Sequence, residues 1–280
     1  MKFWLVVLML LPILIILGLI FRSMPVIHTG DATIFGLSWR PSSGEFGFAP
    51  FIVSSLYVTI IALILAAPLC ISSGIFLCFY AKSSVIKIVQ PVIDILAGIP
   101  SVVYGVWGVL AIVPFVQNLN NLFTGSGGTG YSIFAGGIIL AVMIIPYILN
   151  ILLELFMALP IQLQEAGLSL GAGKWYTIKR IILKKAMPGI ISAIGLGVSR
   201  AFGETMAVMM VVGNVAKIPE GIFQPGYPLP ALIANNYGEM MSIPQYDAAL
   251  MMAALILLII VLVFNMGSRI LTYHYEKSIG

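Results

Sequence analysis

Two ionisable residues stand out because they interrupt an apolar stretch. Arg200 and Glu204 are the only charged residues between Pro188 and Gly213. A charge at membrane depth costs about 2.5–3.5 kcal/mol on insertion scales, so such residues face a bundle interior or a wet path. Four residues apart in a continuous helix, they share one face. Because a guanidinium matches an oxyanion with a fork of donors, the pair predicts an anion relay in which Glu204 restrains Arg200.

A second interpretation of these charges needs no transported ion. Arg200 would be neutralised by Glu204, or would pair with Asp94, the one acidic residue of the preceding apolar run Ile88–Phe115. Packing is also indicated by a strip of small residues at spacings of three and four, which lets another helix approach closely. The strip consists of Ser192, Gly195, Ser199 and Gly203.

The run Ile88–Phe115 itself contains helix-breaking residues close together. Gly98, Pro100, Gly105 and Gly108 predict a broken or kinked helix there. Irregular backbone at membrane depth is tolerated where it lines a cavity. Ser101 and Tyr104 are therefore candidate lining groups, although helix packing explains them equally well.

These residues must be positioned by membrane helices. The chain has 280 residues, of which 60% are apolar and only 9% charged, which indicates an all-α polytopic membrane protein with one transmembrane domain, residues 1–280. Six runs are long enough to cross about 30 Å of hydrocarbon. They are Phe3–Phe21, Phe51–Ala81, Ile88–Phe115, Tyr131–Leu153, Pro188–Gly213 and Ala248–Ser268.

The charges flanking these runs predict the orientation. Lys and Arg concentrate at the N-terminus, around Lys82 and Lys87, between the fourth and fifth runs and at the C-terminus. By the positive-inside rule, the N-terminus is cytoplasmic and residues 22–50 are extracytoplasmic. The first run exceeds the 7 to 15 residues of a signal-peptide core and no Ala-x-Ala site follows, so we expect a retained first helix.

The polar segment 160–187 falls on the cytoplasmic side. Its first half, around Glu165-Ala166-Gly167 and Gly171, predicts a short amphipathic helix in which Leu163, Ala166, Gly167 and Leu170 share one face. Its second half, from Lys174 to Lys185, is basic. That half suits anionic lipid headgroups, whereas the Glu-Ala-Gly half suits contact with another protein.

Enzyme chemistry is not indicated. His28 and His274 are predicted on opposite sides of the membrane, so they cannot share a metal site or a triad. Gly125–Gly130 spells G-x-G-x-x-G but follows no strand and opens a membrane helix, and Gly173-Lys174 lacks the rest of a Walker motif. We expect no metal and no cofactor, with any ATP bound by a partner subunit. Because the basic residues lie at the ends of apolar runs, nucleic acid is not an expected partner either.

The segment with Glu165-Ala166-Gly167, three further residues and Gly171, followed by Ile181 and Leu183, resembles the EAA loop of ABC importer permeases. The resemblance implies a type I importer permease fold and a coupling (EAA) loop, residues 160–187, that docks on an ATPase subunit through Glu165, Ala166, Gly167 and Gly171. Lys184 departs from the pattern, because the family usually has proline there.

A narrower resemblance covers most of the chain and points to PstC-type permeases of bacterial phosphate importers. It rests on Ser38-Trp39-Arg40-Pro41, on the segment LAGIPSVVYGVWG from Leu96 and on Ser199–Asn214. It implies phosphate as substrate, the bacterial inner membrane as location, and as partners a PstA-type permease, two PstB-type ATPase subunits and an external PstS-type phosphate-binding protein. Two alternatives stay open, namely a permease for sulfate or molybdate and a membrane scaffold or regulator that moves no solute.

Overall fold

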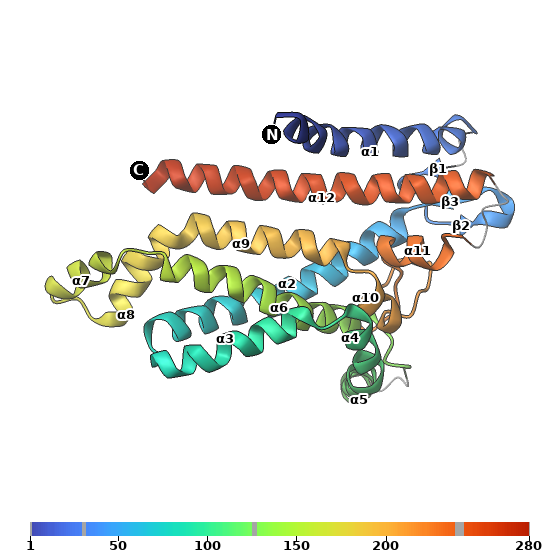
Figure 1. The fold of residues 1–280 in the computed structure, drawn as a ribbon. Helices are drawn as coiled ribbons and strands as arrows, with labels where there is room; N and C mark the ends of the chain where they lie inside the picture. Colours follow the sequence, from blue (N-terminus) through green and yellow to red (C-terminus); the bar gives the residue numbers. More distant parts are fainter. Residues whose placement is uncertain (1, 30–31, 125–127, 239–243, 280) are drawn as a thin grey trace.

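Long helices lying side by side make up most of the protein (Figure 1). The computed structural model describes residues 2–29, 32–124, 128–238 and 244–279. Within them, six helical segments are long and apolar enough to cross a membrane, which confirms the all-α membrane fold. The third of these segments is Ser101–Phe123, and α3 (Ser83–Gly98) is not among the six. The helices that form the other five are α1 (Lys2–Thr29), α2 (Ala49–Phe79), α6 (Ile133–Met157), α9 (Leu183–Gly203) and α12 (Pro244–Ile279).

The molecule has two distinct ends. At one end, the α7 end, Figure 1 shows the C-terminus together with α7 (Ile161–Ser169) and α8 (Lys174–Thr177), while the N-terminal end of α1 points the same way but stops about midway along α12. At the opposite end, the sheet end, lie the short strands and α11 (Leu229–Asn236). The segments predicted on one side of the membrane thus gather at one end of the bundle.

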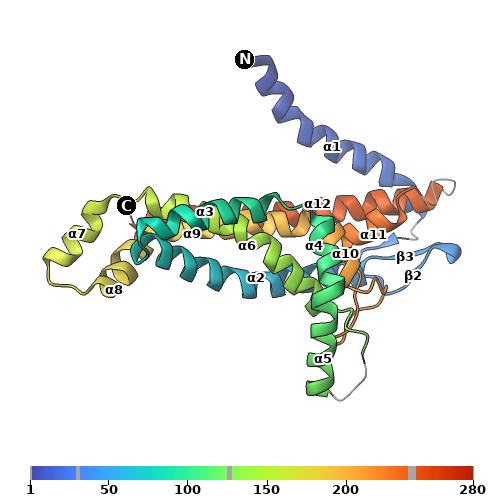
Figure 2. The same cartoon turned by 60° about the horizontal axis from the view of Figure 1, so that its bottom comes forward.

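The first helix is longer than its predicted span and stands apart from the bundle. In Figure 2, α1 leans away from the other helices, yet its sheet end is tied to α12 by an ion pair of 3.6 Å between Arg22 and Asp247. Arg22 was expected to open the segment 22–50, but the helix continues to Thr29. The apolar side chains of α1 are largely exposed, as suits a helix with lipid around it.

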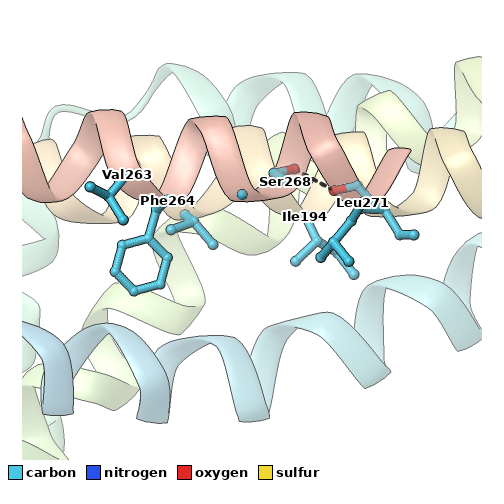
Figure 3. Close-up of a pocket in the computed structure, with 9 residues that line it drawn as sticks. Ile194, Val263, Phe264, Ser268 and Leu271 are labelled. Carbon is cyan, nitrogen blue, oxygen red and sulfur yellow. Dashed lines mark hydrogen bonds between the residues drawn. The ribbon is translucent and has the colours of Figure 1, made fainter. Parts of the chain in front are cut away.

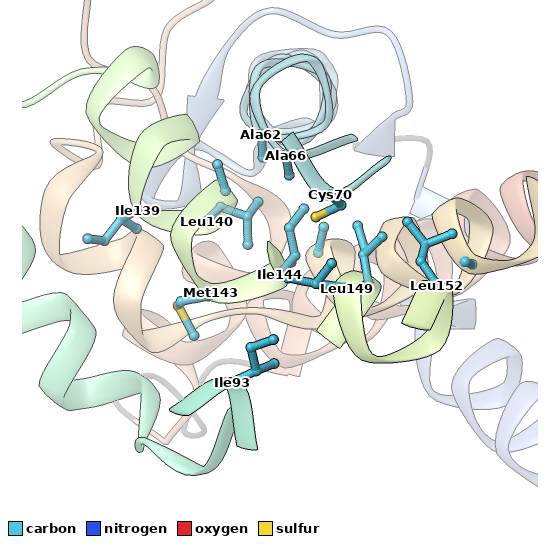
Figure 4. Close-up of a cluster of buried hydrophobic side chains, with 14 of the residues drawn as sticks. Ala62, Ala66, Cys70, Ile93, Ile139, Leu140, Met143, Ile144, Leu149 and Leu152 are labelled. Atoms are coloured by element: carbon cyan, nitrogen blue, oxygen red, sulfur yellow. The ribbon is translucent and has the colours of Figure 1, made fainter. Parts of the chain in front are cut away.

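The core lies mainly between α2 and α6. Figure 4 shows Ala62, Ala66 and Cys70 of α2 facing a row of branched side chains on α6. Small residues on α2 let the backbones approach, because a membrane bundle gains stability chiefly from close packing. The buried α6 row includes Ile139, Leu140, Ile144, Ile148, Leu149 and Leu152.

The third predicted span, Ile88–Phe115, is wrong as one continuous crossing. α3 ends at Gly98, and Ile99 and Pro100 have extended backbones. Beyond this break, α4 (Ser101–Trp107), the π-helical turn η2 (Gly108–Ile112) and α5 (Val113–Thr124) run crosswise to the long helices (Figure 2). The predicted break is therefore present, and it redirects the chain as well as bending it.

The sheet end is capped by a small three-stranded sheet, an addition to the expected all-α fold. Its strands, in the order β1-β3-β2, are β1 (Ala32–Thr33), β2 (Trp39–Arg40) and β3 (Glu45–Gly47), with the 3-10 turn η1 (Pro41–Ser43) between the last two. The Trp39 ring meets those of Phe46, Phe48 and Phe51 edge to face, at centroid distances of 5.4, 5.6 and 5.0 Å. This aromatic cluster anchors the segment before α2. Within the G-x-G-x-x-G segment Gly125–Gly130, residues 125–127 lie outside the described residues.

Candidate transport path and coupling element

Arg200 lies on α9 with its side chain exposed on the surface of the single chain. Its guanidinium carbon is 5.0 Å from the centroid of the Tyr147 ring on α6, a cation–π contact. Among the described residues, Arg200 forms no ion pair. The aromatic face therefore holds the cation and leaves its hydrogen-bonding edge without an acidic partner.

Asp94 lies on α3 and forms no ion pair with Arg200. Its Oδ1 accepts a hydrogen bond of 2.9 Å from Nδ2 of Asn150 on α6. Tyr147 and Asn150, three residues apart on α6, are thus neighbours on its surface. We call Asp94, Asn150, Tyr147 and Arg200 the polar row. It crosses α3, α6 and α9, with both charges exposed.

Glu204 is not part of the polar row, and its predicted pairing with Arg200 is wrong. α9 ends at Gly203, and Glu204 has an extended backbone with φ −76° and ψ 126°. The helix needed to place the two side chains on one face is therefore missing. Instead, Oε1 of Glu204 accepts a bond of 3.4 Å from the backbone N–H of Ala207 at the start of α10 (Met206–Val211).

Ser101 and Tyr104 lie just beyond the break after α3. The buried Tyr104 hydroxyl donates a bond of 2.8 Å to the carbonyl of Leu96. In a continuous helix that carbonyl would accept from residue 100, but Pro100 has no N–H. Tyr104 thus completes the broken helix, while Ser101 is half-buried at the start of α4.

The two other glycines of this region pack α4 and η2 against their neighbours. A Cβ on Gly105 would lie 2.5 Å from the Met210 sulfur, and one on Gly108 would lie 2.9 Å from Cγ1 of Val211. Both contacts involve α10, so these glycines allow the close approach of two segments.

The small-residue strip of α9 packs against α12, which confirms that another helix approaches there. A Cβ on Gly195 would lie 2.7 Å from Cβ of Ser268, and Ser268 Oγ donates to the Ile191 carbonyl at 3.3 Å. Ser199 donates to Oδ1 of Asn265 at 2.5 Å. Beside this seam, Ile194, Val263, Phe264 and Leu271 line an apolar cavity of about 350 Å³ (Figure 3). Gly203 has open space around it.

The coupling element, α7 and α8 with their connecting turn, is held together at Gly167. This residue is buried, and a Cβ there would lie 2.5 Å from Cγ2 of Thr177 and 3.1 Å from Cδ1 of Ile181. Only glycine allows α7 to lie this close to the helix that follows.

Gly171 ends α7. Its φ of +78° is a left-handed conformation that favours glycine. Its N–H donates to the Leu168 carbonyl at 2.9 Å, and the Ala172 N–H donates to the Gly167 carbonyl at 3.2 Å. These are the two bonds of a Schellman motif, so Gly171 shapes the turn and exposes no side chain of its own.

The outer surface of the coupling element differs from the predicted amphipathic face. Leu170 is 87% exposed and Leu168 is also exposed, while Glu165 and Ala166 lie on the same outer surface. Leu163 is half-buried. The expected apolar face is therefore divided, with Gly167 packed inward and Leu170 pointing out of the molecule.

The basic half of the segment is helical. α8, the π-helical turn η3 (Ile178–Ile182) and α9 join into one helical segment, Lys174–Gly203, so the fifth long helix begins well before the predicted Pro188. Lys184, the departure from the expected proline, is exposed on this helix. Its presence is compatible with an uninterrupted helix, because proline would remove a backbone donor there.

Sequence reasoning overlooked Tyr147 and Asn150. Both lie in the apolar run of α6 directly after Pro146. A lone amide at membrane depth is expensive without a partner, so Asn150 was a signal that could have been used. The ring of Tyr147 carries no such signal, because tyrosine is common in membrane helices.

A helical membrane bundle with a protruding coupling element is the fold of type I ABC importer permeases. The family described as "Binding-protein-dependent transport system inner membrane component" matches residues 68–280, and the chain belongs to this family of multi-pass inner-membrane proteins. By that description, its members work with a separate binding protein.

Relatives and solved structures agree with this assignment. A Bacillus subtilis protein named "Probable ABC transporter permease protein YqgH" is 38% identical over 240 residues, covering 83% of this chain and 76% of the relative. "Phosphate transport system permease protein PstC" of Pasteurella multocida is 32% identical over 295 residues, covering 100% and 91%. An inward-facing structure of the MetNI methionine ABC transporter has a TM-score of 0.64 at 17% identity, covering 85% of this chain and 99% of that one.

Proposed function

We propose that this chain is one of two permease subunits that form the path of an ATP-driven importer for inorganic phosphate. The single observation that carries the proposal is the exposed Arg200, held on the Tyr147 ring without an acidic partner among the described residues. The names of PstC relatives at 30–32% identity support phosphate as the substrate.

The polar row supports a position at the centre of the assembled importer. A guanidinium and a carboxylate exposed to lipid at membrane depth would each carry a large penalty. A second permease, of the PstA type, covers this face and leaves a wet path between the two subunits. There the Arg200 fork binds a phosphate oxygen.

The orientation follows from charge. The turn between α2 and α3, which carries Lys82, and α8, η3 and the first turn of α9, which carry Lys174, Lys179, Arg180, Lys184 and Lys185, lie at the α7 end. We infer that this end faces the cytoplasm together with the N-terminus. The sheet end then faces outward, toward a PstS-type phosphate-binding protein.

The coupling element docks on the ATPase. Leu168 and Leu170 are exposed apolar residues on a segment that extends beyond the bundle, and a partner surface would bury them. Two PstB-type subunits supply ATP binding and hydrolysis, since this chain has no Walker motif.

Transport assays with purified components test the proposal. The chain is reconstituted into vesicles with its PstA-type and PstB-type partners, and uptake of labelled phosphate is measured with PstS-type protein and ATP present. We expect ATP-dependent uptake that unlabelled phosphate suppresses and that sulfate and molybdate leave unchanged. Uptake that responds equally to sulfate or molybdate contradicts the substrate, and a complex that assembles but moves no solute identifies a scaffold.

A further inference from the structure

A lateral groove at the α7 end lies between the last turns of α2 and the helical segment Lys174–Gly203, which begins with α8. It has a volume of about 460 Å³ and is lined by Pro68, Ile75 and Phe76 of α2 and by Tyr80 directly after it, together with Trp175 and Leu183. The hydroxyl of Ser72, the polar group inside it, donates to the Pro68 carbonyl at 2.7 Å. Every other lining side chain presents carbon or an aromatic ring.

The dimensions of the groove match one leaflet. Pro68 lies on α2 and Tyr80 directly follows its last residue, twelve positions further on, which corresponds to about 18 Å of helical rise. Half of a hydrocarbon core of about 30 Å is similar in length. The groove is open to the side, because Phe76 and Trp175 are 57% and 54% exposed, so in a membrane an apolar chain can enter it laterally.

The α7 end of the groove is cationic. The ammonium nitrogen of Lys174 lies 4.7 Å from the centroid of the Tyr80 ring. This cation–π contact places a positive charge at the mouth of the groove, where aromatic rings mark the boundary between hydrocarbon and headgroups. Lys184 and Lys185, next to the lining residue Leu183, are also exposed.

We propose that this groove binds an anionic glycerophospholipid of the inner leaflet. One acyl chain lies against Ile75 and Phe76, and the headgroup phosphate meets Lys174. The assignment to the inner leaflet rests on the orientation given under Proposed function. The combination of an apolar groove with a cationic mouth is independent of that orientation.

The site touches the coupling element. Lys174 and Trp175 belong to α8, whose last residue, Thr177, packs on Gly167 of α7. A bound lipid therefore contacts the segment that we propose transmits ATPase movement. Its charge preference gives the membrane composition a direct influence on that segment.

Fluorescence quenching of Trp175 tests the proposal. The full chain is placed in nanodiscs containing increasing fractions of phosphatidylglycerol with brominated acyl chains, and a parallel series uses brominated phosphatidylcholine. The contribution of Trp175 is the quenching lost in Trp175→Phe. We expect half-maximal quenching at a mole fraction of phosphatidylglycerol about fivefold lower than that of phosphatidylcholine. Equal curves for the two lipids would overturn the proposal.

Three variants and one complex complete the experiment. Lys174→Gln should remove the preference for phosphatidylglycerol, while Lys87→Gln, at the same end but on α3, should retain it. Ser72→Phe, which fills the groove from α2, should make the two quenching curves equal, because lipid outside the groove still reaches the exposed Trp175. If the assembled importer protects Trp175 from both lipids, a partner helix occupies the groove and the lipid assignment is wrong. Because no arm measures phosphate, failure here leaves the transport proposal standing, and failed transport leaves this result unaffected.

Discussion

The coupling element and the polar row are opposites in chemistry. In the coupling element, apolar Leu168 and Leu170 are exposed at an end of the bundle that extends beyond the apolar spans. In the polar row, Arg200 is exposed on a segment apolar enough to span a membrane, and Asp94 is exposed on the neighbouring helix α3. Each region thus presents the kind of side chain that its surroundings disfavour, and each gains stability when another molecule covers it.

The two regions also differ in how their geometry is maintained. The coupling element depends on backbone, because Gly167 allows a close contact and Gly171 ends α7. The polar row depends on side chains held across helices by Tyr147 and Asn150. Substitutions should therefore affect assembly in the first region and transport in the second.

Arg200→Ala should produce the largest effect. Removing the guanidinium should lower phosphate uptake by more than about tenfold, or 1.4 kcal/mol, while the ATPase still co-purifies. Arg200→Lys, which keeps the charge but loses the planar fork, should retain an intermediate rate. Uptake at the normal rate in Arg200→Ala vesicles would remove the polar row from the transport mechanism.

Gly167→Ala should come next, with the opposite pattern. The added Cβ meets Thr177 at 2.5 Å, and such overpacking costs about 1–3 kcal/mol. We expect reduced co-purification of the ATPase, restored by adding Thr177→Ala, which removes the clashing atoms. Gly173→Ala is the matched control, since open space surrounds Gly173. Equal behaviour of the two alanine variants would contradict the packing role of Gly167.

Leu170→Ser should weaken docking without altering the fold. The side chain is 87% exposed, so the melting temperature of the isolated permease should not change. Burial against the ATPase would be worth at most about 1.5–3 kcal/mol, so the dissociation constant for the ATPase should rise by up to about a hundredfold. Phe35→Ser, at a residue equally exposed at 87% near the sheet end, should leave that constant as it was. An unchanged constant in Leu170→Ser would show that the docking surface lies elsewhere.

Tyr104→Phe should have the smallest effect. It removes one hydrogen bond to the Leu96 carbonyl, worth about 0.5–1.5 kcal/mol of unfolding free energy, and uptake should stay within about twofold. Ser101→Ala should alter stability less. Lost transport with unchanged stability in Tyr104→Phe would place this hydroxyl in the path.

The sequence was most informative where local chemistry decides the structure. Gly98 and Pro100 predicted a break, and the small-residue strip predicted a close helix contact. The direction of the chain after the break could not be predicted, because it depends on how Gly105 and Gly108 pack against α10, a contact between segments about a hundred residues apart in sequence. Helical periodicity also predicts Glu204 beside Arg200, because it assumes a continuous helix. In the structure α9 ends at Gly203, so this prediction fails.

The division of the coupling segment was likewise only partly predictable. The Glu-Ala-Gly motif located α7 and the need for glycine. The face of α7 that turns inward is decided by contacts with Thr177 and Ile181. Both residues lie in the second half of the segment, Lys174 to Lys185, for which the sequence predicts a basic surface. Helical periodicity alone places Leu170 on the same face as Gly167. The left-handed conformation of Gly171 ends α7 at this point, so Leu170 points outward.

The helical segment from Lys174 to Gly203 has a mechanical consequence. Lys174 and Arg200 are 26 residues apart along it, which corresponds to a lever arm of about 39 Å. A tilt of about 5° at the docking end would displace the guanidinium by about 3 Å, roughly the length of one hydrogen bond. The π-helical turn η3 and Pro188, both features at which helices bend, lie in the first half of this segment. A bend at either position therefore displaces Arg200 at the far end.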